Sequence, residues 1–192
     1  MAVNAILHIH HLALPGYCSF LLLRPGGGSY FWDEDVRDNL RDGLFDVLQE
    51  ATGVKFESVR QFWEAGYYLV PGVKCPSQKA GKDQPPAQIA IRNCASHLKG
   101  EIELSGADRI LALGRIPVRS VAAALHLKIP RKVLGYRGKL WWTMMAGRLI
   151  PVAGTYFAGN DRHQGFENIV EDIKWILGQQ PKTPSESTDA LN

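Results

Sequence analysis

Cysteine is scarce in this chain of 192 residues, which contains only Cys18, Cys75 and Cys94. So small and odd a number excludes a disulfide scaffold and favours a reducing compartment, so we expect a cytoplasmic protein. A run of about 18 uncharged apolar residues is also missing, which argues against a membrane-spanning helix. The first residues carry no Lys or Arg before an apolar run that histidines interrupt, which argues against a secretory signal.

Extremes of hydropathy and charge are lacking as well. Hydrophobic residues make up 45% of the chain and charged residues 21%, close to the values of ordinary globular domains. The net charge of +3 at pH 7 is small. We therefore expect one domain over residues 1–180. The segment 181–192 is polar and has no core-forming pattern, so we expect a flexible tail there.

Acidic residues are absent from one long stretch, between Arg109 and Asn160. Charges of both signs are normally interspersed on a surface that needs only to be soluble. The basic residues of this stretch are Arg109, Arg115, Arg119, Lys128, Arg131, Lys132, Arg137, Lys139 and Arg148. Such a stretch suits contact with the phosphates of DNA, the partner that we expect. The alternative is that these residues scatter over several faces and pair with acidic helices elsewhere in the fold.

Apolar runs alternate with amphipathic segments along the chain. Strands are expected at Tyr17–Leu23, Tyr67–Val70, Arg109–Gly114 and Leu149–Ala153. Helices are expected at Asp33–Thr52, Glu57–Ala65, Ala87–Leu104, Pro117–Leu125 and Gly165–Leu177. This order predicts an α/β fold, a three-layer α/β/α sandwich around a central, mostly parallel four-stranded sheet. Ligands of such sheets bind at the carboxyl ends of the strands.

Several segments at these strand ends have a familiar order and spacing. The expected strand at Tyr67 leads into Val73-Lys74-Cys75-Pro76, and Cys94 follows on the next expected helix. A strand, Ala-Leu-Gly and a helix come next, and the last expected strand leads into Gly154-Thr155-Tyr156-Phe157-Ala158-Gly159. From residue 19 to residue 177, the chain resembles the uracil-DNA glycosylase superfamily, and most nearly its iron–sulfur bacterial and archaeal branch.

The resemblance implies a protein that binds DNA and hydrolyses the N-glycosidic bond of a damaged or deaminated base after flipping it from the duplex. Members of the family position the attacking water with an acid or amide. They also read the base with an Asn and face its developing negative charge with a His. At the matching positions this chain has Leu23, Pro71 and Phe157, all of which are apolar.

Neighbouring residues are the candidates to replace the missing groups. The catalytic candidates are Asp33 and Asp35, which would position water, and His163. The base-binding candidates are Tyr30, Phe31, Trp32, Pro71 and Phe157. The DNA-binding candidates are Arg115, Arg119, Arg137, Asn160 and Arg162. Structural alternatives stay open: the two aspartates would sit at a helix N-terminus, the three neighbouring aromatics would pack in the core or at its rim, and Asp161 or Asn160 would cap the last helix.

The resembled branch holds its iron–sulfur cluster with four cysteines, and Cys75 and Cys94 match only half of that set. We therefore expect no cofactor and no metal, and we expect a monomer that does not bind membranes. Three hypotheses remain open. The protein is an active DNA glycosylase, a catalytically inactive nucleic-acid-binding relative, or a small-molecule enzyme that processes nucleotides or bases.

Overall fold

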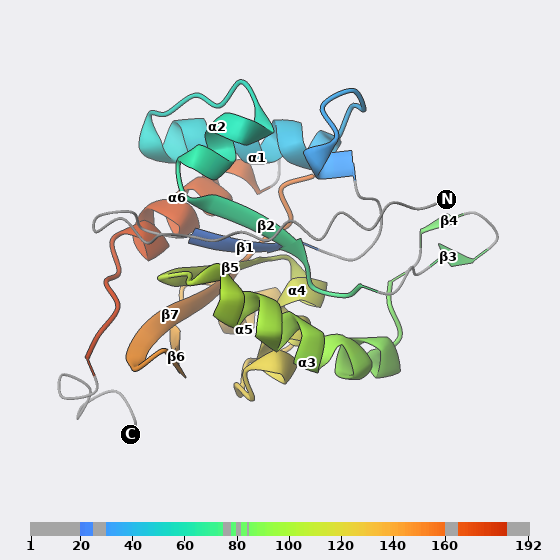
Figure 1. Cartoon of the computed structure of the whole chain (residues 1–192), viewed down its shortest axis with the longest axis vertical. Coiled ribbons are helices and arrows are strands. Elements are labelled where there is room, and N and C mark those ends of the chain that lie inside the picture. The colour runs from blue at the N-terminus through green and yellow to red at the C-terminus, as the bar shows by residue number, and fades with distance from the viewer. Residues whose placement is uncertain are drawn as a thin grey trace.

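A computed structural model describes residues 20–24, 30–74, 78–79, 82–83, 85–159 and 165–183 of the chain (Figure 1). The side chains of 20–24, 30, 78–79 and 82–83 lie outside this description. The helices are α1 (Asn39–Thr52), α2 (Val59–Glu64), α3 (Gln88–Ser105), α4 (Arg115–Ala124), α5 (Val133–Tyr136) and α6 (Phe166–Leu177). A short 3₁₀ helix spans Tyr30–Trp32.

The main sheet has five strands in the order β2-β1-β5-β7-β6. Its strands are β1 (Phe20–Arg24), β2 (Tyr67–Pro71), β5 (Arg109–Leu113), β6 (Trp141–Met145) and β7 (Arg148–Thr155). β1, β2, β5 and β7 run parallel, and β6 pairs with β7 in the antiparallel sense. A separate pair joins β3 (Gln78–Lys79) to β4 (Lys82–Asp83). The α/β class expected from the sequence is confirmed.

The expectation of four strands was wrong, because it missed β6 at the edge of the sheet. Trp141–Met145 shows no alternation of apolar and polar residues that would have marked a strand. Its turn is equally inconspicuous, since Ala146 adopts a φ of 47° and Gly147 one of 77°. Two consecutive residues with positive φ close a tight hairpin. The first of these positions is usually Asn or Asp in such turns, whereas this chain has Ala146 there.

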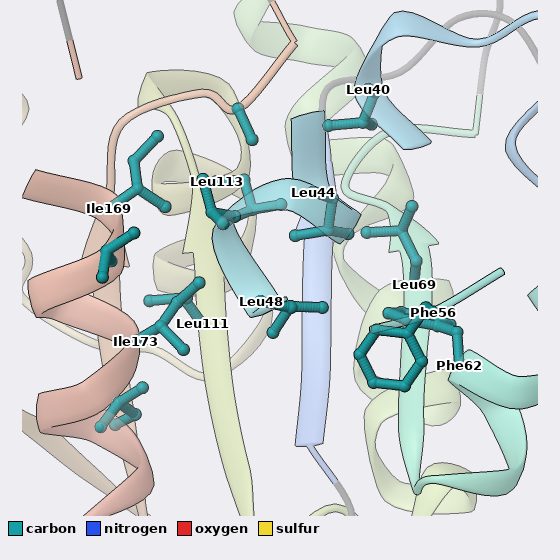
Figure 2. Close-up of a cluster of buried hydrophobic side chains, with 14 of the residues drawn as sticks. Leu40, Leu44, Leu48, Phe56, Phe62, Leu69, Leu111, Leu113, Ile169 and Ile173 are labelled. Atoms are coloured by element: carbon teal, nitrogen blue, oxygen red, sulfur yellow. The ribbon is translucent and has the colours of Figure 1, made fainter. Parts of the chain in front are cut away.

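Helices cover both faces of the sheet (Figure 1). Leu111 and Leu113 of β5 pack against α1 and α6 on one face, and Figure 2 shows this cluster. Ile110 and Ala112 point to the opposite face, where they pack with residues of α3 and α4. Because all five residues of β5 are buried, this strand is the centre of the core.

Helix α1 begins later than expected. Asp38 is its N-cap, and the Asp38 Oδ1 accepts a hydrogen bond of 2.8 Å from the Arg41 N–H. The expected start at Asp33 was wrong, because residues 33–36 form a turn in which the Val36 N–H donates to the Asp33 carbonyl. The acidic residues before the helix therefore belong to a separate turn.

The C-terminal contacts extend beyond the expected domain boundary at residue 180. Lys182 and Leu149 exchange two backbone hydrogen bonds of 2.9 Å each. The Lys182 Nζ also lies 4.7 Å from the ring centroid of Trp142 on β6. In the part of the chain that the structure describes, no helix is both long enough and apolar enough to cross a bilayer.

The strands β1 and β5 are neighbours, yet the helices that follow them lie on opposite faces. The chain goes from β1 to α1 on one face, and from β5 directly to α4 on the other. Adjacent strands whose connections diverge in this way open a crevice at their carboxyl ends, which is where α/β proteins bind ligands. The fold thus marks the edge around Gly114 as the candidate site.

Candidate functional site

The carboxyl ends of the parallel strands meet at one edge, which we call the sheet mouth. Register pairs Arg24 with Pro71 across β1 and β2, and Leu113 with Thr155 across β5 and β7. Gly114 follows β5 directly and donates its N–H to the Thr155 carbonyl over 2.8 Å. The sheet mouth is therefore built by Pro71, Gly114 and the residues that follow Thr155.

Phe157 is packed between two glycines at the sheet mouth. Gly114 has a φ of 91°, and a Cβ on it would lie 3.2 Å from the Phe157 Cβ. A Cβ on Gly159 would lie 2.7 Å from the Phe157 ring. These close approaches explain why both neighbours lack side chains. Phe157 and Pro71 are both half-buried. Pro71 ends β2 and Phe157 follows the end of β7, so both base-binding candidates lie at the predicted edge of the sheet.

Helix α4 presents an uncapped N-terminus at the sheet mouth. Its N-cap is Gly114, which has no side chain to accept a hydrogen bond from the first turn. Pro117 has no N–H, and the Val118 N–H bonds the Gly114 carbonyl. The N–H groups of Arg115 and Ile116 have no acceptor among the described residues. Two free donors at the positive end of a helix form a favourable environment for an anion.

Arg115 and Arg119, two of the DNA-binding candidates, lie one turn apart on α4. Arg115 is exposed and Arg119 is half-buried. Within the described part of the chain neither has an ion pair. Both guanidinium groups are therefore available to an external anion.

Tyr136 is a buried residue that the sequence analysis missed. Its side chain is 1% exposed, and its ring packs over Gly154, where a Cβ would lie 2.9 Å from the Tyr136 Cδ2. Burial raises the pKa of Tyr136 to about 12, the Tyr156 hydroxyl adds to that rise, and the positive charge of Arg115 opposes it. The positive charge of Arg115 therefore acts on the Tyr136 hydroxyl. Among the described residues this hydroxyl has no hydrogen-bond partner.

Arg137, a third DNA-binding candidate, is held inside the protein. Its Nε donates to the Asp172 Oδ2 over 2.9 Å, and its Nη2 donates to the Glu171 Oε2 over 3.0 Å. The Nη2 also donates to the Asn168 carbonyl over 3.2 Å, and the guanidinium lies 5.9 Å from the ring centroid of Tyr156. Arg137 therefore joins the segment after α5 to α6, which is the pairing alternative of the sequence analysis.

Asp172 is the buried centre of this network. Its Oδ2 also accepts a hydrogen bond of 2.5 Å from the Thr155 Oγ1, at the end of β7. Burial raises the pKa of Asp172 above its ordinary range, although the hydrogen bonds from Thr155 and Arg137 and the charge of Arg137 lower it. Burial lowers the pKa of Arg137, but Asp172 and Glu171 more than compensate and the pKa is raised overall.

Other basic residues of the acid-free stretch divide into two groups. Arg109 is 1% exposed and its Nε donates to the Gln179 carbonyl over 2.8 Å, while Arg148 pairs with Asp108 over 2.7 Å. The exposed members without an ion pair among the described residues are Lys128, Arg131, Lys132 and Lys139. The pairing alternative is therefore confirmed for Arg109, Arg137 and Arg148, whereas contact of the exposed residues with DNA stays a prediction.

The aromatic candidates before α1 differ in exposure. Phe31 is fully buried and packs edge-on against Phe62 with ring centroids 5.4 Å apart, so it takes the core alternative. Trp32 is 38% exposed and lies 5.8 Å from the Tyr68 ring at the rim of the core. The side chain of Tyr30 lies outside the described residues.

Asp33 and Asp35 are exposed on the turn before α1. The Asp33 Oδ1 accepts a hydrogen bond of 3.2 Å from the Asp35 N–H. Arg41 fixes the turn onto α1, because its Nη1 donates to the carbonyls of Phe31 and Asp33 and its Nη2 donates to the Val36 carbonyl. These bonds use the backbone and leave both carboxylates facing solvent, which differs from the helix-terminal alternative.

Asn160, Arg162 and His163, together with Cys75, lie outside the described residues. Cys94 is buried beside Val73 and Ile91. Among the described residues, no group of His, Cys, Asp and Glu is arranged to hold a metal ion.

A cavity of about 520 Å³ lies against α1. Its lining residues are Glu34, Arg41, Asp42, Phe45, Asp46, Phe56, Glu57 and Ser58. Because its carboxylates outnumber its single arginine, this cavity is poorly suited to a phosphate.

No protein-family model matches the chain, and no curated protein matches it. The uracil-DNA glycosylase resemblance therefore depends on the order of elements and on the segments quoted from the sequence.

Proposed function

We propose that the protein binds DNA at the sheet mouth, with helix α4 receiving a backbone phosphate. The observation that carries this proposal is the uncapped N-terminus of α4, where two N–H groups and the exposed Arg115 have no partner among the described residues. The proposal includes the three-layer α/β/α sandwich expected from the sequence, in which the sheet lies between two layers of helices.

Two further features support a phosphate at this position. Arg119 lies one turn along the same helix. Lys128, Arg131 and Lys132 follow it and are exposed, with no ion pair to any residue that the structure describes. Backbone amides, guanidinium groups and hydroxyls are the donors that commonly contact DNA phosphates.

Within this proposal, the activity is excision of a damaged or deaminated base by hydrolysis of its N-glycosidic bond. Asp33 or Asp35 would activate or orient the attacking water, because both carboxylates face solvent on a turn that Arg41 holds in place. Phe157 would contact the flipped base from the sheet mouth. These roles depend on the resemblance to uracil-DNA glycosylases.

A catalytically inactive DNA-binding relative is the second candidate. The observation in its favour is that Pro71 and Phe157 both lie at the sheet mouth and neither has a polar side-chain group. A base anion leaving the sugar would meet no hydrogen-bond donor from these two side chains. In this case the protein recognises DNA and leaves it intact.

Fluorescence anisotropy with labelled single-stranded and duplex oligonucleotides tests the binding step. We expect Arg115→Gln and Arg119→Gln each to weaken binding and to reduce the slope of log K against log salt by about 1. The matched control is Arg60→Gln on α2, where Arg60 pairs with Glu64, and this variant should bind like the wild type. Equal binding by all variants would contradict the proposed site.

An abasic-site assay on oligonucleotides with uracil, hypoxanthine, xanthine or mismatched thymine separates the two candidates. Excision that is lost in Asp33→Ala or Asp35→Ala supports the glycosylase. Salt-dependent binding without abasic sites supports the inactive relative. Affinity for mononucleotides without steep salt dependence would replace both with a small-molecule enzyme.

A further inference from the structure

The outward face of helix α3 has features that no contact within the described residues explains. Ile89 is 60% exposed and Leu104 is 86% exposed, at opposite ends of this helix. Between them lie Asn93, Ser96 and Gly100, which recur every three or four residues and so share the face opposite the buried Ile91 and Leu98. Two large apolar side chains therefore flank a stripe of small and polar ones.

Gly100 is the most unusual member of this face. A Cβ at Gly100 would meet no described atom within 4 Å, so no close approach in the described part of the chain requires a glycine there. Glycine in the interior of a helix destabilises it by about 0.5–1 kcal/mol relative to alanine. A glycine can compensate for this loss of stability where it lets another helix pack closely against its backbone.

The face is complementary to itself in the antiparallel sense. When two copies of α3 pack antiparallel, with a two-fold axis between Ser96 and His97, Ile89 lies level with Leu104 of the second copy. In the same register Asn93 lies level with Gly100 of the second copy, so the small residue receives a larger one. Both apolar side chains are then covered.

Charge complementarity supports the same arrangement. Arg92 and Glu103 are separated by three helical turns and therefore lie on one flank of α3. Like flanks of antiparallel helices face each other, which brings Arg92 to Glu103 of the second copy, twice by symmetry. Arg92 is exposed and has no ion pair among the described residues, whereas Glu103 has only an exposed Lys99 3.7 Å away.

We propose that the outward face of α3 is a homodimer interface, in which two copies pack antiparallel through Ile89, Gly100 and Leu104 and pair Arg92 with Glu103. This inference is independent of the proposed DNA binding and replaces the expected monomer with a dimer. The contact is about 22 Å long at 1.5 Å per residue. An interface from one helix per copy is smaller than standard stable interfaces, so the dimer is weak and reversible.

Sedimentation velocity of the full chain from about 1 to 300 µM, a range suited to a weak interface, tests the proposal. We expect a concentration-dependent dimer whose Kd rises about tenfold or more in Leu104→Glu. The matched control is Leu134→Glu on α5, because Leu134 is also 86% exposed but lies outside α3. It should dimerise like the wild type.

Two further variants separate the interface from general effects on folding. Arg92→Glu should weaken the dimer, and the double variant Arg92→Glu/Glu103→Arg should restore it, because the charges are exchanged and not removed. Gly100→Leu should raise the stability of the monomer and weaken the dimer, since leucine favours helix and fills the approach site. A wild-type protein that stays monomeric at about 300 µM, or a Leu104→Glu dimer of unchanged Kd, would overturn the proposal.

Discussion

The backbone of Gly114 determines how β5 turns into α4. Its φ of 91° and ψ of 173° lie in a region that is essentially restricted to glycine, and its missing Cβ leaves space for Phe157. We predict that Gly114→Ala lowers the free energy of unfolding by about 1–3 kcal/mol, as measured by urea denaturation. Gly100→Ala is the matched control, because it should raise that free energy by about 0.5–1 kcal/mol. Equal effects of the two substitutions would contradict this account.

Asp172 gives a second test at the residue scale, through pH. Its pKa is raised in the folded protein, so between the unfolded and folded pKa values the native state binds more protons than the unfolded state. The free energy of unfolding should therefore fall as pH rises from about 4, the ordinary pKa of an aspartate, through the raised folded value. Urea denaturation across this range should show the decrease in the wild type and not in Asp172→Asn. A wild-type free energy of unfolding that rises with pH relative to that of Asp172→Asn would contradict the raised pKa.

At the scale of single elements, substitutions before α1 test which residue caps that helix. Asp38 caps the helix through its Oδ1, whereas Asp35 lies in the preceding turn with an exposed carboxylate. We predict that Asp38→Ala lowers the free energy of unfolding by about 1 kcal/mol. Asp35→Ala should change it by less than about 0.5 kcal/mol. The reverse order, measured by urea denaturation, would restore the start at Asp33 that the acidic run suggests.

The elements with a strong hydrophobic pattern could be predicted from the sequence, and the others could not. Arg109–Leu113 is a strand because a continuous apolar run fits a strand that is covered on both faces. β6 and its hairpin could not be predicted, because Ala146 in the turn adopts a conformation that is rare for alanine. The cap at Asp38 was hidden among several acidic residues that are equally suitable as caps.

Candidate residues could be predicted where they follow strand ends, and less well where long-range pairing decides their role. Arg115 lies beside the sheet mouth because it begins α4, one residue after the end of β5. Arg137 looks the same in the sequence, yet Asp172, 35 residues away, holds its side chain. The burial of Tyr136 beside the site could not be predicted from the sequence, because it depends on Gly154 and Arg115. Only the fold brings these two residues near the tyrosine.

At the scale of the whole molecule, charge is separated between layers. The cavity against α1 contains more carboxylates than basic groups. In contrast, the layer of α4 and its following loop contains Arg115, Arg119 and Lys128, which have no ion pair within the described ranges. A polyanion would therefore be attracted to one side of the sheet and repelled from the other. The proposed α3 interface lies on the same face as α4 and leaves α1 uncovered.

The most direct test of DNA binding at the sheet mouth is the salt dependence of oligonucleotide affinity for the wild-type protein. If α4 and its neighbours contact several phosphates, log K should fall linearly with log salt, with a slope of about −0.9 for each phosphate contacted on a duplex. Replacing Arg115 and Arg119 together should reduce the magnitude of that slope by about 2. An affinity that does not change with salt, or no binding at about 50 mM salt, would contradict the account.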